Sequence, residues 1–437
     1  MGQQYRPPPR PARRTGRILL VLWAILTAAQ LGYVLAFGHN QPWADEWEFV
    51  PTLTGHEETA AFYLQPHNEH RLPLPRAIYL GLWDLTRDFR SGMILQVALL
   101  SAMAHRGLRL AAKLRGEARW ADAFFPLSLL HVGHCENLLM GYQLCFVLAS
   151  ALAFGVLELA VRWTPENGPQ TALLAALAAL ALTLCGGFGI VLAIPISIWV
   201  LVLIARNGMR GVASTTVAVG CLIAAAAYLG FVFTTYQRPP DHPPFQWTNW
   251  FASLQVAGEF LAISLGIGVG AVWFAVLPLL GVALGIAIRE TPHWTPRIGS
   301  LGIASVAVGV VLLSLAIGAG RGGFGSQMGL WPRYSVLAWP LLAAIYFASL
   351  QNQWVPTALM VTAVFAFLPN TFFGLDYGRR HDDWLDSITS QLKNGFSTKD
   401  IVEHSLKGNG QEARALRGIP MLHEAKIGPF ADWKGSP

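Results

Sequence analysis

The stretch ILLVLWAILTAAQLGYVLAF, residues 18–37, contains no charged side chain and leads directly into GHNQPWADEWEF, residues 38–49. A helix needs about 20 apolar residues to cross the ~30 Å hydrocarbon core of a bilayer. Backbone groups find no water to bond in lipid, so a segment that spans it must be helical. The first stretch therefore predicts a membrane-spanning helix, and the second predicts a polar loop at the membrane surface.

The composition extends this prediction to most of the chain. Of 437 residues, 53% are hydrophobic and 13% are charged, and the mean hydropathy is +0.42. A water-soluble fold of this size cannot hide so much apolar surface. We predict an all-α polytopic membrane protein with about eleven transmembrane helices, twelve being possible. After a second span that ends before Arg106, the further spans are predicted near 119–135, 142–161, 170–186, 188–205, 212–234, 270–288, 298–318, 335–350 and 355–373.

Residues 250–288 admit two interpretations. They form either two tight spans, or one interfacial helix that carries Gln255 and Glu259, followed by a single span near 270–288. We prefer the second interpretation, which places the bases that follow, Arg289 and Arg297, in the cytoplasm.

The distribution of charge predicts the orientation. The net charge is +6, and residues 1–17 carry five arginines and no acid. Basic residues stay on the cytoplasmic side, so this Pro/Arg-rich arm and the bases from Arg106 to Arg119 are placed there. Residues 38–74 hold six acids against one base and therefore lie outside. Topology thus explains the positive charge, and no nucleic-acid partner is predicted.

Three regions follow from this topology. The cytoplasmic arm comprises residues 1–17, and a transmembrane domain comprises residues 18–373. Within that domain, residues 38–90 form an outer loop with amphipathic surface helices, one of them predicted over Leu72–Leu85. Residues 374–437 form a soluble tail, which the parity of the spans places outside.

Two polar clusters lie in the first outer loop. Asp45 and Glu46 stand between tryptophans, where a carboxylate can take a proton from an acceptor hydroxyl or hold a divalent cation. A solvated loop with interfacial tryptophans is the alternative. The second cluster consists of His67, Asn68, Glu69, His70 and Arg71. Its arginine can bind a phosphate, while its histidines and glutamate can transfer a proton or bind a metal.

Two further clusters interrupt later apolar runs at their predicted outer ends. In the third cluster, ionisable groups lie at membrane depth, where burying them costs free energy, and this indicates a function. The alternative is a capped helix turn. In the last cluster, glycines allow close approach to a ligand and arginines can clamp a lipid phosphate, the alternative being interfacial anchoring. The predicted topology brings all four clusters to one face, as parts of one pocket. The third cluster contains His134, Glu136, Asn137 and Gln143, and the fourth contains Arg321, Arg333 and Tyr334.

With these residues the chain resembles the C-type (GT-C fold) membrane glycosyltransferases, which include the protein O-mannosyltransferases and the lipid A aminoarabinose transferases. The resemblance rests first on Asp45-Glu46 in a first outer loop that is followed by surface helices and many spans. The segments His67 to Arg71, Glu136 to Gln143 and Arg321 to Tyr334 are similar to those of poorly characterised bacterial members. The resemblance covers residues 18–373, and the chain departs from better-known members in lacking a large soluble C-terminal domain.

The resemblance implies transfer of a sugar from a polyprenyl-phosphate donor to a glycan, lipid or protein acceptor. The reaction would take place at the outer, periplasmic face of the bacterial cytoplasmic (inner) membrane. Asp45 corresponds to the family's catalytic carboxylate, with Glu46 beside it. The implied donor-phosphate ligands are Arg333, Arg321, Arg71 and Tyr334. The residues that would orient the acceptor or hold a divalent cation, Mg²⁺ or Mn²⁺, are His67, Asn68, Glu69, His70, His134, Glu136, Asn137 and Gln143.

Two other classes of function use the same residues. A transporter or flippase for a lipid-linked or anionic solute would bind it with the arginines and couple protons through the carboxylates. It predicts charges in mid-membrane on several helices, of which the predicted spans are nearly free. In a non-catalytic assembly subunit, the polar clusters on one face would be an accident.

Overall fold

The fold of the chain is helical. The computed structural model describes residues 10–207, 211–238, 242–243, 249–408 and 410–436, and within these ranges the elements are helices, with one isolated β-bridge between His67 and His70. Seven helices in this part of the chain are long and apolar enough to cross a membrane. An all-α polytopic membrane protein is thereby confirmed, whereas the number of crossings stays a prediction. Residues 1–9 of the predicted arm lie outside the described residues.

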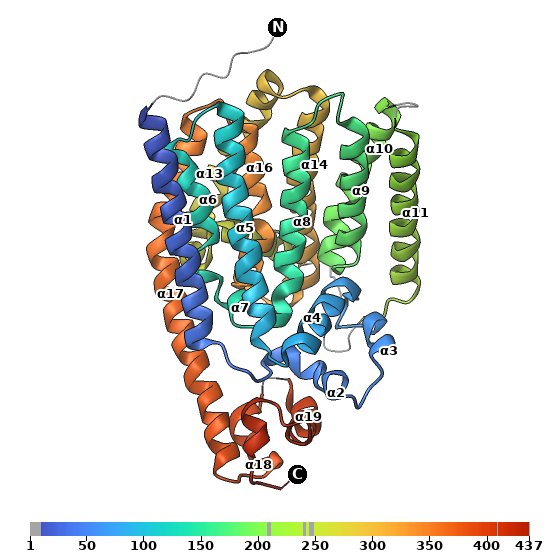
Figure 1. The fold of residues 1–437 in the computed structure, drawn as a ribbon, viewed down its shortest axis with the longest axis vertical. Helices are drawn as coiled ribbons and strands as arrows, with labels where there is room; N and C mark the ends of the chain where they lie inside the picture. The colour runs from blue at the N-terminus through green and yellow to red at the C-terminus, as the bar shows by residue number, and fades with distance from the viewer. Residues whose placement is uncertain (1–9, 208–210, 239–241, 244–248, 409, 437) are drawn as a thin grey trace.

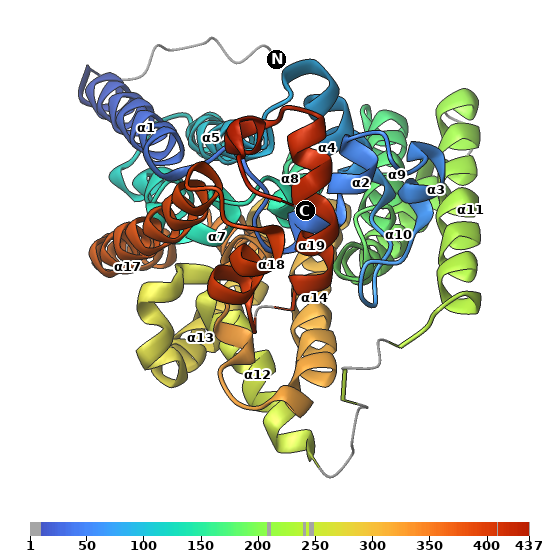
Figure 2. The ribbon, with the colours of Figure 1, turned by 90° about the horizontal axis from the view of Figure 1, so that it is seen from below.

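The long helices pack side by side in one bundle (Figure 1). One end of the bundle, which we call the loop face, carries the first loop, residues 38–89, and the tail, residues 394–436 (Figure 2). Glycine permits close packing within the bundle, since a Cβ at Gly302 would lie 2.6 Å from Ala160 and from Trp199. Helices in lipid associate through such small residues. The bundle helices are α1 (Arg10–Phe37), α5 (Arg90–Arg115), α8 (Leu144–Val161), α9 (Gly168–Thr183), α10 (Gly187–Asn207), α11 (Val212–Thr234), α13 (Trp273–Trp294), α14 (Arg297–Arg321), α15 (Tyr334–Ala338), α16 (Pro340–Ala348) and α17 (Trp354–Lys393).

The continuous helix predicted near 119–135 is wrong. The chain there forms short pieces because a side chain from another helix satisfies its freed backbone carbonyls: Gln30 of α1 donates to the carbonyls of Leu129 and His131. Irregular backbone is tolerated at membrane depth where protein groups bond it in this way. The pieces are η2 (Trp120–Ala123), α6 (Phe124–Leu129), η3 (Val132–His134), α7 (Cys135–Leu138) and η4 (Gly141–Gln143).

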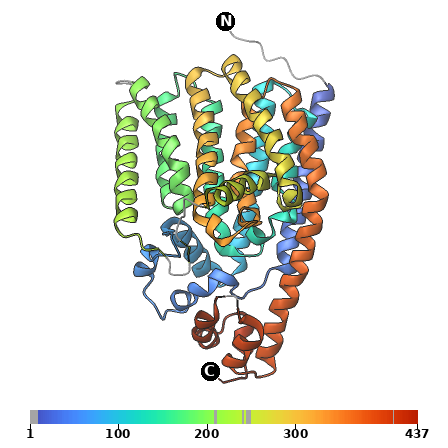
Figure 3. The ribbon, with the colours of Figure 1, turned by 180° about the vertical axis from the view of Figure 1, so that it is seen from behind.

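Residues 250–272 form a helix and two short turns before α13. Helix α12 (Trp250–Ala262) carries Gln255 and Glu259, and Figure 3 shows this yellow-green part of the chain lying across the bundle direction. It is followed by η6 (Ile263–Leu265) and η7 (Ile267–Val272). The buried carboxylate of Glu259 accepts hydrogen bonds from the backbone N–H groups of Gln327 and Gly329. Glu259 therefore anchors the segment that leads to Arg333.

Both predicted borders of the transmembrane domain, after residue 17 and after residue 373, fall inside continuous helices. Helix α1 starts at Arg10, and the 40-residue helix α17 continues to Lys393. Arginine and most other charged side chains are good helix formers, so a drop in hydropathy does not end a helix.

The tail folds back onto the first loop at the loop face. Gly418 of the tail lies against Trp47, and Arg417 pairs with Glu57 at 3.2 Å. The predicted surface helix over Leu72–Leu85 is confirmed as a helix. The helices of the loop are η1 (Ala44–Glu48), α2 (Val50–Leu53), α3 (Thr59–Leu64) and α4 (Pro73–Thr86), and those of the tail are α18 (Thr398–Ile401), η10 (Val402–Leu406), α19 (Glu412–Glu424) and η11 (Gly428–Asp432).

Candidate active site

A cavity of about 360 Å³ opens at the loop face, and we call it the loop-face cavity. Its walls come from the first loop, from η4, α8, α10, α11 and α14, and from the residues around Arg333. Residues from all four polar clusters of the sequence meet in it. The predicted residues that line it are Asp45, His67, Asn68, Glu69, His70, Gln143, Arg321, Arg333 and Tyr334.

His67 stands between two carboxylates. Its Nδ1 lies 2.5 Å from Glu48 Oε2, and its Nε2 lies 3.6 Å from Asp45 Oδ2. Burial lowers the pKa of His67, but hydrogen bonds to Asp45 and Glu48 outweigh this and raise the pKa to about 9. Burial likewise opposes ionisation of Asp45, but the hydrogen bond from His67 and the charges of His67, Arg333 and Arg414 hold its pKa below the ordinary value. Asp45 is therefore an ionised carboxylate at neutral pH.

This arrangement predicts how stability depends on pH. The pKa of His67 is raised from 6.5 to about 9 in the folded protein, so its protonated form contributes stability below pH 6.5 that is lost as the pH rises through 9. We expect the midpoint of thermal unfolding in detergent to fall over this window. The fall should be clearly smaller in His67→Gln, and equal falls in both proteins would contradict the assignment.

Arg76 of α4 holds the first loop in place through hydrogen bonds. Its guanidinium is fully buried and donates to Glu48 at 2.6 Å and to the carbonyls of Phe62 and Gln65 at 2.6 Å each. Glu48 in turn bonds His67, so Arg76 supports the side chain that bonds Asp45. Sequence reasoning did not assign Glu48 or Arg76 to the site, and the signal for Arg76 is a lone arginine within an apolar helix.

Replacing Arg76 by Met is expected to lower the free energy of unfolding by about 3–5 kcal/mol, because the carbonyls of Phe62 and Gln65 and one oxygen of Glu48 would lose their buried donor. Denaturant unfolding in detergent measures this. Arg87→Met, which changes an arginine exposed at the end of α4, should leave stability nearly unchanged. Equal effects of the two substitutions would contradict the role of Arg76.

Glu46, which was predicted as a second catalytic carboxylate, does not line the cavity. It is fully buried, and its carboxylate accepts hydrogen bonds from the Tyr79 hydroxyl at 2.6 Å and from the Trp43 backbone N–H at 3.1 Å. Burial outweighs these bonds and raises the pKa of Glu46 to about 7. Glu46 thus holds the loop together.

The three predicted arginines differ in their availability to a ligand. Arg333 stacks on Trp331, with its guanidinium carbon 4.0 Å from the ring centre, and within the described residues no carboxylate oxygen lies within 4.0 Å of that guanidinium. Arg321 is paired with Glu69 at 2.6 Å. Arg71 does not line the cavity and instead donates to the carbonyl of Leu64. Arg333 is therefore the cation available for an anionic ligand.

The predicted residues of the third cluster, except Gln143, lie behind the cavity wall. Glu136 accepts the backbone N–H of Arg333 at 3.2 Å, and Asn137 donates to the carbonyl of Arg333 at 3.2 Å. His134 is fully buried and bonds the Ser335 hydroxyl at 2.8 Å. These side chains position the segment that carries Arg333, and the prediction that they orient an acceptor or hold a cation stays a prediction.

The tail contributes residues that sequence reasoning missed. Gln411 donates to Asp45 at 3.5 Å, and Arg414 lies 3.5 Å from Glu48. Gln411 and Asp45 are 366 residues apart, and the balanced charge of the tail gave no signal of this contact.

The rest of the cavity wall is apolar. Its side chains project from α10, α11 and α14, and α11 stands at the edge of the bundle in Figure 2. A cavity of this kind suits a hydrocarbon chain whose charged end lies near Arg333. The apolar wall includes Phe188, Val191, Leu229, Phe233, Leu313 and Ile317.

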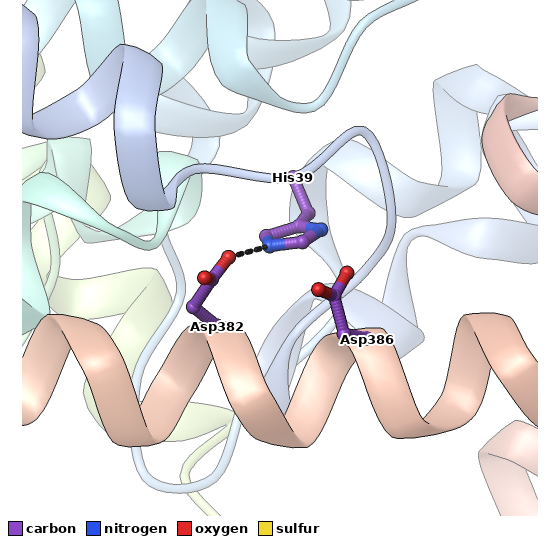
Figure 4. A group of neighbouring side chains, drawn as sticks. All are labelled: His39, Asp382 and Asp386. Carbon is purple, nitrogen blue, oxygen red and sulfur yellow. Dashed lines mark hydrogen bonds and ion pairs between the residues drawn. The ribbon is translucent and has the colours of Figure 1, made fainter.

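The predicted divalent cation does not fit the donor set of the cavity. Both nitrogens of His67 face carboxylates, and Glu69 is engaged by Arg321 and by His242 at 3.0 Å. The described residues gather three potential ligands elsewhere, His39, Asp382 and Asp386, whose ligand atoms lie within 4.8 Å of one another (Figure 4). In that group His39 Nε2 and Asp382 Oδ1 are 2.7 Å apart, a contact that ties the first loop to α17.

The fold and the cavity together define a polytopic helical membrane protein with an ionised carboxylate, an available arginine and an apolar wall in one cavity at the loop face. Comparison of the chain with protein-family models, curated proteins and solved structures gives no match. The function is therefore inferred from the chemistry of the cavity.

Proposed function

We propose that the chain is a membrane glycosyltransferase that moves a sugar from a polyprenyl-phosphate donor to an acceptor hydroxyl of a glycan, lipid or protein at the loop face. The observation that supports this most is that Asp45 and Arg333 line one cavity whose remaining wall is apolar. Such a cavity offers a base, a counter-charge for phosphate and a surface for an isoprenoid chain, which are the three needs of this reaction.

In the proposed step, Asp45 removes the proton of the acceptor hydroxyl as general base. The acceptor oxygen bonds to the anomeric carbon of the sugar, with inversion, while the bond from that carbon to the donor phosphate oxygen breaks. Polyprenyl phosphate leaves with a developing negative charge, which Arg333 stabilises. His67 keeps Asp45 ionised and oriented, and Arg321 and Glu69 together offer groups that can bind the sugar hydroxyls.

The distribution of charge indicates which side of the membrane each end of the bundle occupies. The basic N-terminal arm favours a cytoplasmic N-terminus, and the acidic first loop favours an extracytoplasmic loop face. We therefore place the reaction on the periplasmic side of a bacterial inner membrane. No step is assigned to a Mg²⁺ or Mn²⁺ ion, because the donor groups of the cavity are already paired with one another.

Purified protein in liposomes, incubated with a panel of polyprenyl-phosphate sugars and candidate acceptors, tests the proposal. Release of polyprenyl phosphate together with a glycosylated acceptor, both followed by mass spectrometry, is the expected result. If labelled donor instead crosses the bilayer with its sugar–phosphate bond intact, the protein is a flippase and the proposal fails.

A further inference from the structure

A second cavity, of about 480 Å³, lies at the other end of α14, and we call it the far groove. It is bounded by α13, α14 and α16. Along α14 it runs from Arg297 to Leu312, whereas the loop-face cavity contacts the same helix from Leu313 to Arg321. The two cavities therefore occupy successive parts of one helix and are separate sites.

The far groove opens on the outer surface of the bundle and is mostly apolar. Its floor is made deep by small buried side chains, Ala287, Ala344 and Ala348, and its rim carries the exposed side chains of Ile288 and Leu301. Lipid tails cover a flat helix surface without any specific binding. An empty groove leaves its lining atoms without contacts, so a chain that lies along the groove is favoured there.

Arg297 supplies a positive charge at one end of the groove. Its side chain is exposed, and within the described residues no carboxylate oxygen lies within 4.0 Å of its guanidinium. It is also the first residue of the 25-residue helix α14, whose first turn contains no acid. The free N–H groups of that turn add to the positive potential.

The far groove is long enough for one hydrocarbon chain of a single leaflet. The path from Arg297 to Leu312 covers about 22 Å of helix at ~1.5 Å per residue, compared with about 15 Å for half of the hydrocarbon core.

We propose that the far groove binds an anionic glycerophospholipid, with its phosphate at Arg297 and one acyl chain along α13 and α14. Charge complementarity at Arg297 selects an anionic headgroup, and the apolar length of the groove selects an acyl chain. This site is independent of the function proposed for the loop-face cavity.

Native mass spectrometry of the full chain tests the headgroup contact. Detergent-solubilised protein is incubated with phosphatidylglycerol or with phosphatidylcholine of the same acyl chains, and the retained lipid is counted. We expect Arg297→Gln to weaken phosphatidylglycerol retention about tenfold, the size of one lost charge-assisted contact. Arg289→Gln, which removes an exposed charge on α13 outside the groove, should retain the lipid as the native chain does.

A second pair of variants tests the groove itself. Ala304→Phe places a ring into the groove from its exposed side and should abolish the preference for phosphatidylglycerol, while Ala226→Phe on the exposed side of α11 should not. Retention by Arg297→Gln or Ala304→Phe equal to that of the native chain would overturn the proposal. So would a dimer that forms only without lipid and is lost in Ala304→Phe, because a second copy would then be the occupant.

Discussion

Asp45→Asn is expected to lower the rate of sugar transfer by about 10²–10⁴-fold, the usual contribution of a general base. Asparagine keeps the shape of the side chain but cannot accept the acceptor's proton. Single-turnover transfer with a labelled donor measures the rate of the chemical step, and thermal unfolding of the same sample confirms that the variant is folded.

Asp84→Asn is the matched control for Asp45. Asp84 lies on α4 in the same loop, its side chain is 73% exposed, and it does not line the loop-face cavity. Its replacement should leave the transfer rate unchanged. Transfer by Asp45→Asn at the native rate would remove the proposed base, and with it the assignment of the cavity as a transferase site.

Arg333→Gln is expected to lower the transfer rate by about 10²–10³-fold, because the leaving phosphate would lose the charge that stabilises it. Arg333→Lys should give an intermediate rate, since it keeps the charge but loses the planar fork and the stacking on Trp331. Rates at saturating and at low donor concentration separate loss of donor binding from loss of the chemical step.

Arg71 provides the sharpest comparison for Arg333. Both arginines were predicted from the sequence to bind the donor phosphate, but Arg71 bonds the carbonyl of Leu64 away from the cavity. Arg71→Gln should therefore stay within about fivefold of the native rate. A loss as large as that of Arg333→Gln would show that the donor phosphate binds elsewhere than proposed.

The sequence predicts the bundle well where apolar length alone decides the structure. The helix predicted over 212–234 is α11, and the span predicted near 298–318 is α14 within a few residues. Prediction failed over 119–135, because the helix there is broken where Gln30 of α1 donates to the carbonyls of Leu129 and His131. Hydropathy along one segment contains no information about such distant donors.

Residues from all four predicted clusters line one cavity, but the sequence did not distinguish among the neighbouring carboxylates of the first loop. The segment Ala44–Glu48 is a 3₁₀-helix, in which side chains three residues apart lie on one side. Asp45 and Glu48 therefore both meet His67, while Glu46 points into the core. The three-residue spacing of Asp45 and Glu48 was the available signal, but only if the type of helix is known.

The contact between the first loop and the tail also constrains how the protein is made. Asp45 leaves the ribosome early, and its partner Gln411 follows 366 residues later. At 5–20 residues per second this delay is roughly 20–70 s. During that interval the carboxylates of the loop lack their partner from the tail, so assembly of the finished site is among the last events of biogenesis.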